Sequence, residues 1–418
     1  MNIPETMETA AIFHTIDDFN VRGKRVLLRV DLNVPIRDGK VTDTLRIARV
    51  LPTIRTLTER GAKVVLLSHL GRPKGRAVPE LSLRPIVAPL EAGLGRKVAF
   101  AEDCVGDVAA GTVAGLEAGQ IALLENLRFH PGEEANAADF AGQLAALGEL
   151  YVNDAFSCSH RAHASVERLA KEMPAAAGPL LEEELTTLER LLTRPKRPIM
   201  AIVGGAKVST KLDVLDHLVG KMDSLAIGGA MANTFLLAQE LPIGRSLAEP
   251  DMVKTAAAIL ARAAANGCRI LLPEDVVVAK ELREGIATET VPVSAMPTDR
   301  MILDVGPQTV ARLMENLRAA KTLVWNGPLG AFETPPFDRA TVAAAKEAAR
   351  LTQAGNLLSV GGGGDTIAAL HRAGLDTAFS YISTAGGAFL DWLGGKTLPG
   401  ITALAPPPGR QVTSRKKD

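Results

Sequence analysis

Short apolar runs recur along the whole chain, and each one stops at a glycine, an amide, an acid or a histidine before helical spacing begins. In the first half they cover residues 25–30, 64–67, 98–101, 121–124 and 150–152. In the second half they cover residues 199–203, 224–227, 269–272, 322–325 and 357–360. Buried strands that alternate with helices are typical of α/β folds with parallel sheets. The pattern therefore predicts an α/β protein with two similar, mainly parallel sheets.

The chain has 418 residues, which exceeds the size at which one hydrophobic core keeps growing, so we expect two domains. A strongly amphipathic segment, residues 179–192, lies between Gly178 and the Pro195 to Pro198 stretch, and we interpret it as an interdomain helix. This divides the chain into residues 1–178 and 193–395. Residues 276–302 are less regular and rich in Val and Thr, which favours antiparallel strands whose pairing the sequence leaves open.

One helix is expected directly after the first strand. Its apolar face is predicted to carry Leu45, Ala48, Leu51, Ile54 and Leu57, its stop is Gly61, and Pro52 lies inside it.

The balance of charges argues against some classes of partner. Lys and Arg together number 47, as do Asp and Glu, and this neutrality gives no support to wholesale binding of nucleic acid or anionic membrane.

The sequence also bears on the cellular compartment. No apolar run reaches the roughly 18 residues needed to span a bilayer, and residues 1–11 do not resemble a signal peptide. Three distant cysteines form no disulfide or zinc framework, so we expect a reducing cytoplasm. We expect the tail after Ala405 to be frayed.

Residues 356–370 are predicted to form a strand, a loop of four glycines and a helix. Glycines let the backbone approach a ligand closely, and a helix N-terminus offers unpaired N–H groups to an anion such as phosphate. Asp365 would repel a phosphate unless a cation such as Mg²⁺ lies between them. The alternative is that Asp365 or Thr366 simply caps the helix.

Cationic and amide side chains follow the predicted strands of the first half. Ligands of parallel sheets bind beyond the carboxyl ends of strands, where guanidinium groups suit carboxylate and phosphate. The residues at these positions are Asp31, Asn33, Arg46, His69, Arg72, Arg128 and Arg161. Each arginine has the alternative of a solvated face or a salt bridge, and His69 that of a structural hydrogen bond. Cys158, His160 and His163 suggest a metal site, but a fourth ligand is not evident.

The strand ends of the second half are rich in glycine instead. Gly204 and Gly205 precede Lys207 and Lys211 in a spacing that is not a Walker A loop. Further along, Gly228 and Gly229 offer bare backbone to a flat ring, while Asn326 and Glu333 are candidates for ribose or metal-linked contacts; tight strand-to-helix packing is the alternative for these glycines. Two lysines and Asp365 on one sheet edge point to a polyphosphate. A nicotinamide dinucleotide is less well supported, because neither half opens with Gly-x-Gly-x-x-Gly.

These motifs, in this order, resemble those of the phosphoglycerate kinase family over essentially the whole chain. The matching segments are RVDLNVP at 29–35, SHLGRP at 68–73, LENLRFH at 124–130, HRAH at 160–163, GGAKV at 204–208, WNGP at 325–328 and GGGDT at 362–366. The resemblance implies a monomeric, cytoplasmic kinase of glycolysis, built of two Rossmann-like three-layer α/β domains that face each other across a hinge cleft. It implies reversible phosphoryl transfer between 1,3-bisphosphoglycerate and Mg-ADP, giving 3-phosphoglycerate and Mg-ATP. It also implies that residues 396–418 return to the N-terminal domain.

Carried over residue by residue, the resemblance puts phosphoglycerate on the N-terminal domain and the nucleotide on the C-terminal domain. The implied phosphoglycerate ligands are the strand-end residues Asp31, Asn33, Arg46, His69, Arg72, Arg128 and Arg161. The implied nucleotide ligands are Lys207, Lys211, Gly228, Gly229, Asn326, Glu333, Gly362, Gly363, Gly364, Asp365 and Thr366. Asp365 is the implied Mg²⁺ ligand, and Arg46, Lys207, Gly363 and Gly364 the implied catalytic groups, with Arg46 contributed late, on closure.

The chain departs from the family pattern at a few positions. Thr210 stands where many relatives have Asp, and Ala385 and Phe389 change the segment 383–391. A non-catalytic sensor of nucleotides or acid phosphates on the same scaffold is the main alternative. A complete set of arginines together with Lys207 and Asp365 argues against it, because a binding module has no need for both halves.

Overall fold

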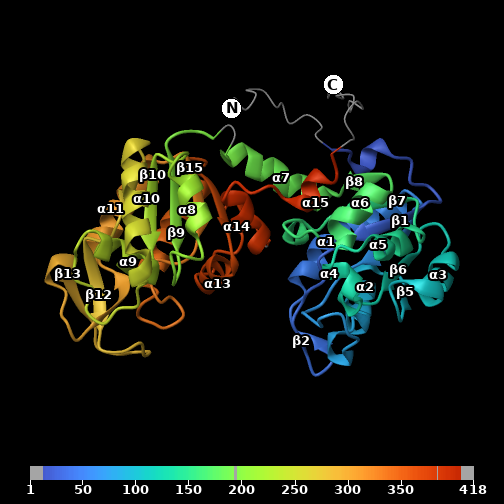
Figure 1. The fold of residues 1–418 in the computed structure, drawn as a ribbon, viewed down its shortest axis with the longest axis horizontal. Helices are drawn as coiled ribbons and strands as arrows, with labels where there is room; N and C mark the ends of the chain where they lie inside the picture. The colour runs from blue at the N-terminus through green and yellow to red at the C-terminus, as the bar shows by residue number, and fades with distance from the viewer. Residues whose placement is uncertain (1–12, 193–194, 384, 406–418) are drawn as a thin grey trace. The chain divides into compact units, whose positions relative to one another are not determined.

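A computed structural model describes residues 13–192, 195–383 and 385–405. The chain forms two compact units (Figure 1). Unit 1 runs to Leu185 and resumes at Thr397, and unit 2 comprises Thr186–Lys396. No helix within the described residues is long and apolar enough to cross a membrane. Two of the sequence predictions concern residues 1–11 and the tail after Ala405, and both segments lie outside the described residues.

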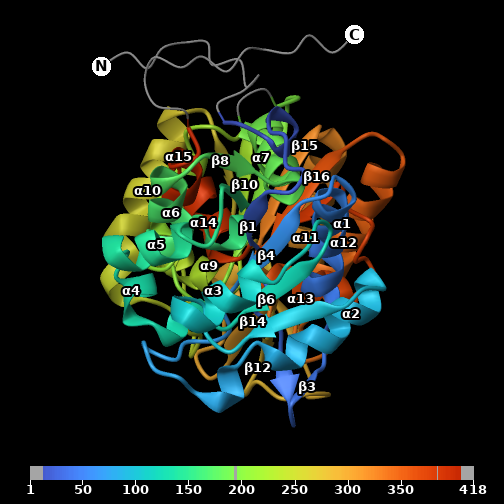
Figure 2. The ribbon, with the colours of Figure 1, turned by 90° about the vertical axis from the view of Figure 1, so that its right-hand side faces the viewer.

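Unit 1 is built around a six-stranded parallel sheet with the order β5-β6-β4-β1-β7-β8. Neighbouring strands β1, β4 and β6 can be followed in Figure 2. The central strands are almost fully buried, as expected for a parallel sheet covered on both faces. The strands are β1 (Arg25–Arg29), β4 (Lys63–Leu67), β5 (Val98–Ala101), β6 (Ile121–Leu124), β7 (Leu150–Asn153) and β8 (Ala175–Ala177), with a β2 (Ile36–Arg37) and β3 (Lys40–Val41) hairpin. The α-helices are α1 (Leu45–Glu59), α2 (Val87–Leu94), α3 (Gly106–Ala114), α4 (Pro131–Glu134), α5 (Ala138–Ala145), α6 (Leu169–Glu172) and α15 (Pro399–Thr402).

Unit 2 repeats this plan with a parallel sheet of order β11-β10-β9-β15-β16-β17. Its strands are β9 (Ile199–Gly204), β10 (Ser224–Gly228), β11 (Arg269–Leu271), β15 (Thr322–Asn326), β16 (Leu358–Gly362) and β17 (Tyr381–Ser383). Its helices are α8 (Leu212–Leu218), α9 (Ala230–Ala238), α10 (Val253–Ala265), α11 (Pro307–Ala319), α12 (Arg339–Gln353), α13 (Gly364–Arg372) and α14 (Gly387–Leu393). The prediction of two parallel-sheet α/β domains is confirmed.

A small antiparallel sheet accounts for the irregular stretch in unit 2. Its order is β13-β12-β14, from β12 (Asp275–Ala279), β13 (Glu289–Pro292) and β14 (Met301–Val305). The antiparallel strands expected between residues 276 and 302 are thus present. The structure adds their pairing, including a register shift between Val277 and Val278.

Helix α1 shows where the predicted pattern was wrong. Leu45 is 54% exposed, and the buried stripe begins instead at Ile47 and continues through Val50, Ile54 and Leu57. These four positions follow the helical period more closely than the predicted set, so the face of the helix is rotated from the expected one. Helix α1 passes through Pro52 without ending there, and Gly61, with φ of 80°, lies just beyond its end as predicted.

Helix α7 (Pro179–Leu192) has the bounds expected for the connecting helix, and the division between the units falls within it. Its N-terminus is capped by a buried residue of unit 1, because Asp154 Oδ1 accepts hydrogen bonds from the backbone N–H groups of Leu180 (2.8 Å) and Leu181 (3.1 Å). The chain is back in unit 1 at α15, where the Gly400 N–H donates to the Ser159 carbonyl at 2.9 Å.

Candidate functional site

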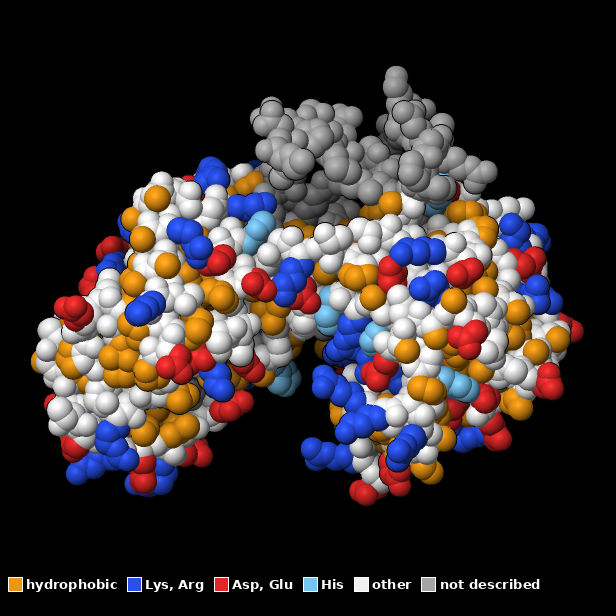
Figure 3. All heavy atoms as spheres, viewed as in Figure 1, with side chains coloured by type: hydrophobic (Ala, Val, Ile, Leu, Met, Phe, Trp, Pro, Cys, Tyr) orange, Lys and Arg blue, Asp and Glu red, His pale blue; other side chains and the backbone are white. Residues whose placement is uncertain are grey.

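The sheet of unit 1 brings the predicted strand-end residues to one edge. Strands β1, β4, β6 and β7 are parallel neighbours in register, so the segments that follow them start at the same level. Figure 3 shows a band of Lys and Arg side chains on unit 1, at the right of the view. Residues about 130 positions apart meet here because parallel strands all end on the same side of the sheet.

A carboxylate organises the first part of this edge. Asp31 Oδ2 accepts hydrogen bonds from Arg46 Nη1 (2.6 Å) and Ser157 Oγ (2.5 Å). Asn33 in turn accepts the Gly71 N–H at 3.0 Å through its Oδ1 atom. The Arg46 side chain remains 34% exposed, so Asp31 orients its guanidinium while leaving part of it open to a ligand.

A fully buried arginine that the sequence analysis missed lies beneath these residues. Arg29 donates to Ser165 Oγ (3.0 Å) and to the Val30 carbonyl (2.6 Å), and its Nη2 lies 3.1 Å from His69 Nδ1. Burial, followed by the positive charges of Arg29 and other arginines, lowers the pKa of His69 well below its usual value. His69 is therefore neutral at physiological pH, and its Nδ1 accepts from Arg29.

Three further arginines follow the strands of this edge, and only one of them has an acidic partner. Arg128 is buried and donates from Nη1 to the Gly71 carbonyl at 2.7 Å, while its Nε forms no hydrogen bond with a described residue and lies 3.4 Å from Glu134 Oε1 in an ion pair. Arg72 is exposed and Arg161 half-buried, and neither side chain forms a hydrogen bond or ion pair with a described residue. Burial, and then Arg161 and Arg29, lower the pKa of Arg128. Unpaired cations at this density favour binding of an anion.

The Cys158, His160 and His163 set does not come together as a metal site in the described structure. Cys158 Sγ lies 3.6 Å from Arg29 Nη2, while His163 Nδ1 lies 3.8 Å from the buried carboxylate of Glu133. Burial and the nearby arginines lower the pKa of His163 to about 3. Positive charge concentrated around these side chains makes the place unsuitable for a cation.

In unit 2, Lys211 joins two glycine loops. Its Nζ donates to the carbonyl of Gly204, to the carbonyl of Asn326 (3.0 Å) and to Asn326 Oδ1 (2.5 Å). Burial lowers the pKa of Lys211 to about 8, with Asp365 acting in the opposite direction. All three N–H bonds of the ammonium are therefore used inside the protein. Close approach of the two loops also explains why positions 204 and 327 are glycines, because a Cβ on Gly204 or on Gly327 would overlap the backbone of the other loop.

The glycine loop before α13 ends at Gly363, whose φ of 95° favours glycine. Gly363 is the N-cap residue, and no side chain caps the helix, so the alternative that Asp365 or Thr366 serves as the cap is wrong. Thr366 is buried, and its Oγ1 accepts the Gly327 N–H at 2.7 Å. The first turn of α13, which includes Gly364 and Asp365, therefore keeps backbone N–H groups available for an anion.

Lys207 and Asp365 differ from Lys211 because their side chains are exposed and have no hydrogen bond or ion pair within the described part of the chain. The loop that carries Lys207 is nevertheless fixed. Glu249 accepts hydrogen bonds from the N–H (3.0 Å) and Oγ (2.5 Å) of Ser209, and Thr210 Oγ1 donates to the Lys207 carbonyl at 2.8 Å. Thr210, one of the departures from the family pattern, thus closes this loop without an ion pair. A free carboxylate oxygen beside a helix N-terminus suits Mg²⁺, which usually takes one or two carboxylates and completes its shell with phosphate and water.

The remaining predicted nucleotide ligands are more dispersed. Gly229 has φ of 66° and donates its N–H to the Leu329 carbonyl at 2.7 Å, and Gly228 packs against Leu329. Glu333 is exposed, and its backbone carbonyl accepts from Arg372 at 3.0 Å. Gly362 packs against the ring of Phe389, so that this second departure forms the floor of the glycine loop. Ala385 is buried, and the neighbouring residue 384 lies outside the described residues.

Comparisons with known proteins agree with this arrangement. The family model for phosphoglycerate kinase matches residues 16–396. A phosphoglycerate kinase from Ruegeria sp. (strain TM1040) is 61% identical over 390 residues, covering 93% of this chain and 98% of the relative, and one from Rhizobium meliloti is 59% identical over 393 residues, covering 94% and 98%. The solved structure of phosphoglycerate kinase from Coxiella burnetii has a TM-score of 0.87 at 42% identity, and that from Pyrococcus horikoshii OT3 a TM-score of 0.80 at 33%. Each structure covers 94% of this chain and matches over 98% of its own length. With residues 16–396 matched by the family model and 93–94% of its length matched by relatives and solved structures, the chain belongs to the phosphoglycerate kinase family.

Proposed function

We propose that the family reaction is carried out by the two half-sites described above, with phosphoglycerate on unit 1 and the magnesium nucleotide on unit 2. The observation that carries the proposal is the position of the unused polar groups. Unit 1 leaves Arg72 and Arg161 without partners beside a neutral His69, and unit 2 leaves Lys207, Asp365 and the first turn of α13 without partners. Both sets are suited to phosphate groups.

On unit 1, the phosphoglycerate would contact the arginines while the neutral residues fix its orientation. Arg72, Arg128 and Arg161 supply the positive charge. Asn33 and His69 are held by hydrogen bonds to Gly71 and Arg29, so they lose little freedom on binding. Arg46, held by Asp31, is the arginine that we assign to the transferring phosphoryl group on closure.

On unit 2, the phosphate chain would lie over Gly362, Gly363 and Gly364 with Lys207 beside it. Asp365 would hold Mg²⁺, which when bound neutralises charge on the phosphate oxygens. Lys211 and Asn326 keep the two loops in place, and Gly228, Gly229 and Glu333 would receive the nucleoside end.

The chemistry asks the protein for position and charge. In the direction that consumes ATP, a carboxylate oxygen of 3-phosphoglycerate forms the new bond to the γ-phosphorus while the bond to the β–γ bridging oxygen breaks and ADP leaves. The carboxylate is already ionised at neutral pH, so no general base is needed, in agreement with the neutral and occupied His69. Charge on the equatorial oxygens is stabilised by Lys207, Arg46 and the α13 amides.

The reaction also needs the half-sites to approach each other and exclude water, because they belong to different units. We assign the flexing elements to α7 and to residues 383–387. We further propose that the enzyme works as a monomer in the cytoplasm, without nucleic-acid or membrane partners.

The division of labour is tested by measuring the binding of 3-phosphoglycerate and of Mg-ADP separately, by calorimetry, to Asp365→Ala. We expect Mg-ADP affinity to fall by about tenfold or more, because one carboxylate ligand of the metal is lost, while 3-phosphoglycerate affinity stays unchanged. Asp376→Ala, which removes an acid from the loop after the same helix, is the matched control. An equal loss of affinity for 3-phosphoglycerate and for Mg-ADP in Asp365→Ala would contradict the proposal.

A coupled assay for ATP formed from 1,3-bisphosphoglycerate separates an enzyme from a non-catalytic sensor.

A further inference from the structure

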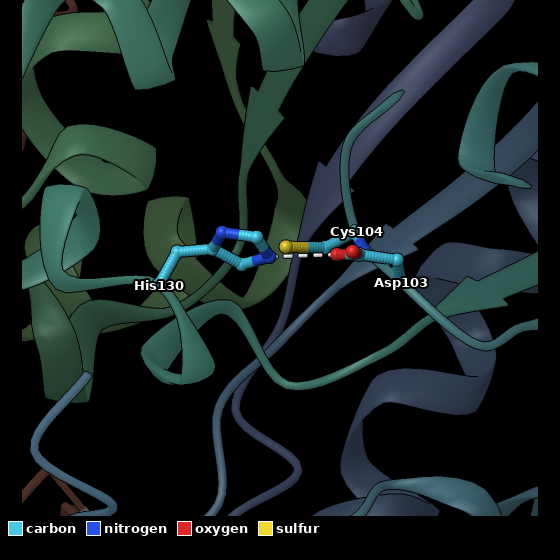
Figure 4. A group of neighbouring side chains, drawn as sticks. All are labelled: Asp103, Cys104 and His130. Carbon is cyan, nitrogen blue, oxygen red and sulfur yellow. Dashed lines mark hydrogen bonds and ion pairs between the residues drawn. The ribbon is translucent and has the colours of Figure 1, made fainter. Parts of the chain in front are cut away.

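Three side chains that play no part in the phosphoryl-transfer sites meet at another place on unit 1 (Figure 4). Asp103 and Cys104 follow β5, and His130 comes shortly after β6. Strands β5 and β6 pair in parallel, with Ala101 opposite Leu124, so the segments beyond them leave the sheet side by side. The topology thus places a carboxylate, a thiol and an imidazole together.

The ligand atoms of these residues are close and converge. His130 Nε2 lies 2.6 Å from Asp103 Oδ1, and both lie within 4.8 Å of Cys104 Sγ. In Figure 4 the sulfur points at the His130–Asp103 pair. Cys104 is fully buried, and its thiol has no hydrogen-bond partner within the described residues. A buried free thiol is ordinary by itself, because cysteine packs like a small apolar residue. The observation that points to a metal is the convergence of the sulfur, an imidazole nitrogen and a carboxylate oxygen within 4.8 Å of one another.

We propose that Asp103, Cys104 and His130 bind one divalent transition-metal ion of the Zn²⁺ type, with a fourth position open to water. Zinc prefers this mixture of sulfur, nitrogen and oxygen in tetrahedral geometry at about 2.0–2.3 Å, which sets neighbouring ligand atoms about 3.3–3.7 Å apart. Reaching those separations asks the imidazole and carboxylate to part by about 1 Å. The side chains of His130 and Asp103 are 31% and 43% exposed, so the ion can enter from solvent.

Binding of the metal ion requires one proton to leave the site and another to move within it. The thiol proton is released as the sulfur–metal bond forms, and the imidazole proton moves from Nε2 to Nδ1 as Nε2 binds the metal. Burial, and next the Asp103 carboxylate, raise the pKa of the Cys104 thiol well above its usual value, so the metal competes with a firmly held proton.

Two features hold the ligands in place. The His130 ring stacks on Phe140 with centroids 5.2 Å apart, and Asp103 Oδ1 accepts the Cys104 N–H at 2.6 Å. The Mg²⁺ that accompanies the nucleotide is no competitor, since a hard cation prefers sites made wholly of oxygen ligands.

Titration of the metal-free full-length protein with Co²⁺ tests the site, because a cobalt–thiolate bond gives a near-ultraviolet charge-transfer band. We expect one equivalent to produce this band, Zn²⁺ to displace it, and Zn²⁺ to raise the melting temperature. Cys104→Ser should abolish the band, and His130→Gln should weaken Zn²⁺ binding by about 10- to 100-fold. Asp103→Asn gives an independent measurement should either variant fail to fold.

Two controls match the ligands elsewhere in the chain. Cys268→Ser removes another buried thiol, and His371→Gln removes a histidine that also pairs with an acid, Asp376 at 2.8 Å, but without a thiol nearby. Both should bind metal as the unaltered protein does. Absence of the band in the unaltered protein, or a band that survives Cys104→Ser, would overturn the proposal.

Discussion

The two proposed half-sites present charge in different ways. In unit 1 the site is made of side chains, several of them buried and already bonded to one another, as in the Arg29–His69 and Asp31–Arg46 pairs. In unit 2 the site is made mostly of backbone, with glycine loops, a free helix N-terminus and two exposed charged residues.

The difference follows from the ligands that each site suits. A small anion with a carboxylate and a phosphate offers few atoms, so fixed side chains must recognise each of them. A polyphosphate chain offers a row of oxygens, which a row of backbone N–H groups can follow at little cost in side-chain entropy. Unit 1 therefore depends on a supporting network, and unit 2 on close approach of the main chain.

The largest expected effect separates the two lysines of unit 2. Lys207→Ala should lower kcat by about 10²-fold or more, because it removes a donor to the transferring phosphoryl group. Its free energy of unfolding should change by less than about 0.5 kcal/mol, because the side chain is exposed and unpartnered. Steady-state kinetics and urea unfolding provide both numbers.

Lys211→Met is the comparison for that experiment. It leaves the carbonyls of Gly204 and Asn326 without their cationic donor, so we expect a loss of about 1–3 kcal/mol in stability in addition to a loss of activity. Equal stability effects from the two variants would show that Lys211 does not join the loops, and a near-normal rate for Lys207→Ala would remove that residue from the catalytic groups.

The next effect probes the network of unit 1. Arg29→Met keeps the bulk of a long side chain but takes partners from His69, Ser165 and the Val30 carbonyl, all buried. We expect the free energy of unfolding to fall by about 3 kcal/mol. Arg25→Met, which breaks an exposed pair with Glu149, should cost no more than about 1 kcal/mol. Similar losses in the two variants would mean that the buried network does not support the site.

The smallest effect concerns pH. Burial holds the pKa of Lys211 at about 8, below its usual 10.5, so the ammonium loses its proton as the pH rises through 8. Its charge beside Asp365 and the phosphate site is then lost. Between pH 7 and 8.5 we expect kcat/KM for the nucleotide to fall by severalfold.

The control is Lys211→Arg, whose guanidinium stays charged in this range, so its profile should be flat. Loss of the folded state through deprotonation of Lys211 cannot cause this fall in kcat/KM. The unfolded chain keeps this proton up to about pH 10.5, so the contribution of Lys211 makes the fold more stable, not less, as the pH rises from 8. Identical profiles for the two proteins would assign the titration to another group.

Much of the fold was predictable because parallel strands are continuous apolar runs. Every run named from the sequence is a strand whose ends differ by at most two residues from the prediction. The edge strands β8 and β17 were not predicted, because Ala175–Ala177 has no β-branched residue and Tyr381–Ser383 is only three residues long. The first turn of α1 was assigned to the wrong face because Leu45 fits an apolar pattern but is exposed in the structure.

The candidate site was predictable where residue type carries the information. Arginines and histidines at strand ends and glycines before helices were visible in the sequence. Their internal partners were not, because Arg29 pairs with residues 40 and 136 positions away and only the fold reveals them. The one available signal was a charged residue inside an apolar strand. Likewise, nothing in the sequence showed that Lys211 would be used internally and Lys207 left free.

The carboxylate of Asp154 belongs to two helices at once. One oxygen accepts the N–H groups of Leu180 and Leu181 in the first turn of α7, and the other accepts the hydroxyl of Thr53 in α1, the helix whose first turn carries Arg46. If α7 tilts about its N-terminus, as proposed for closure, it would pull on α1 through a single side chain. In mechanical terms, Asp154 would then act as a pivot, and the arginine that we assign to the transferring phosphoryl group would lie on the arm that this pivot moves.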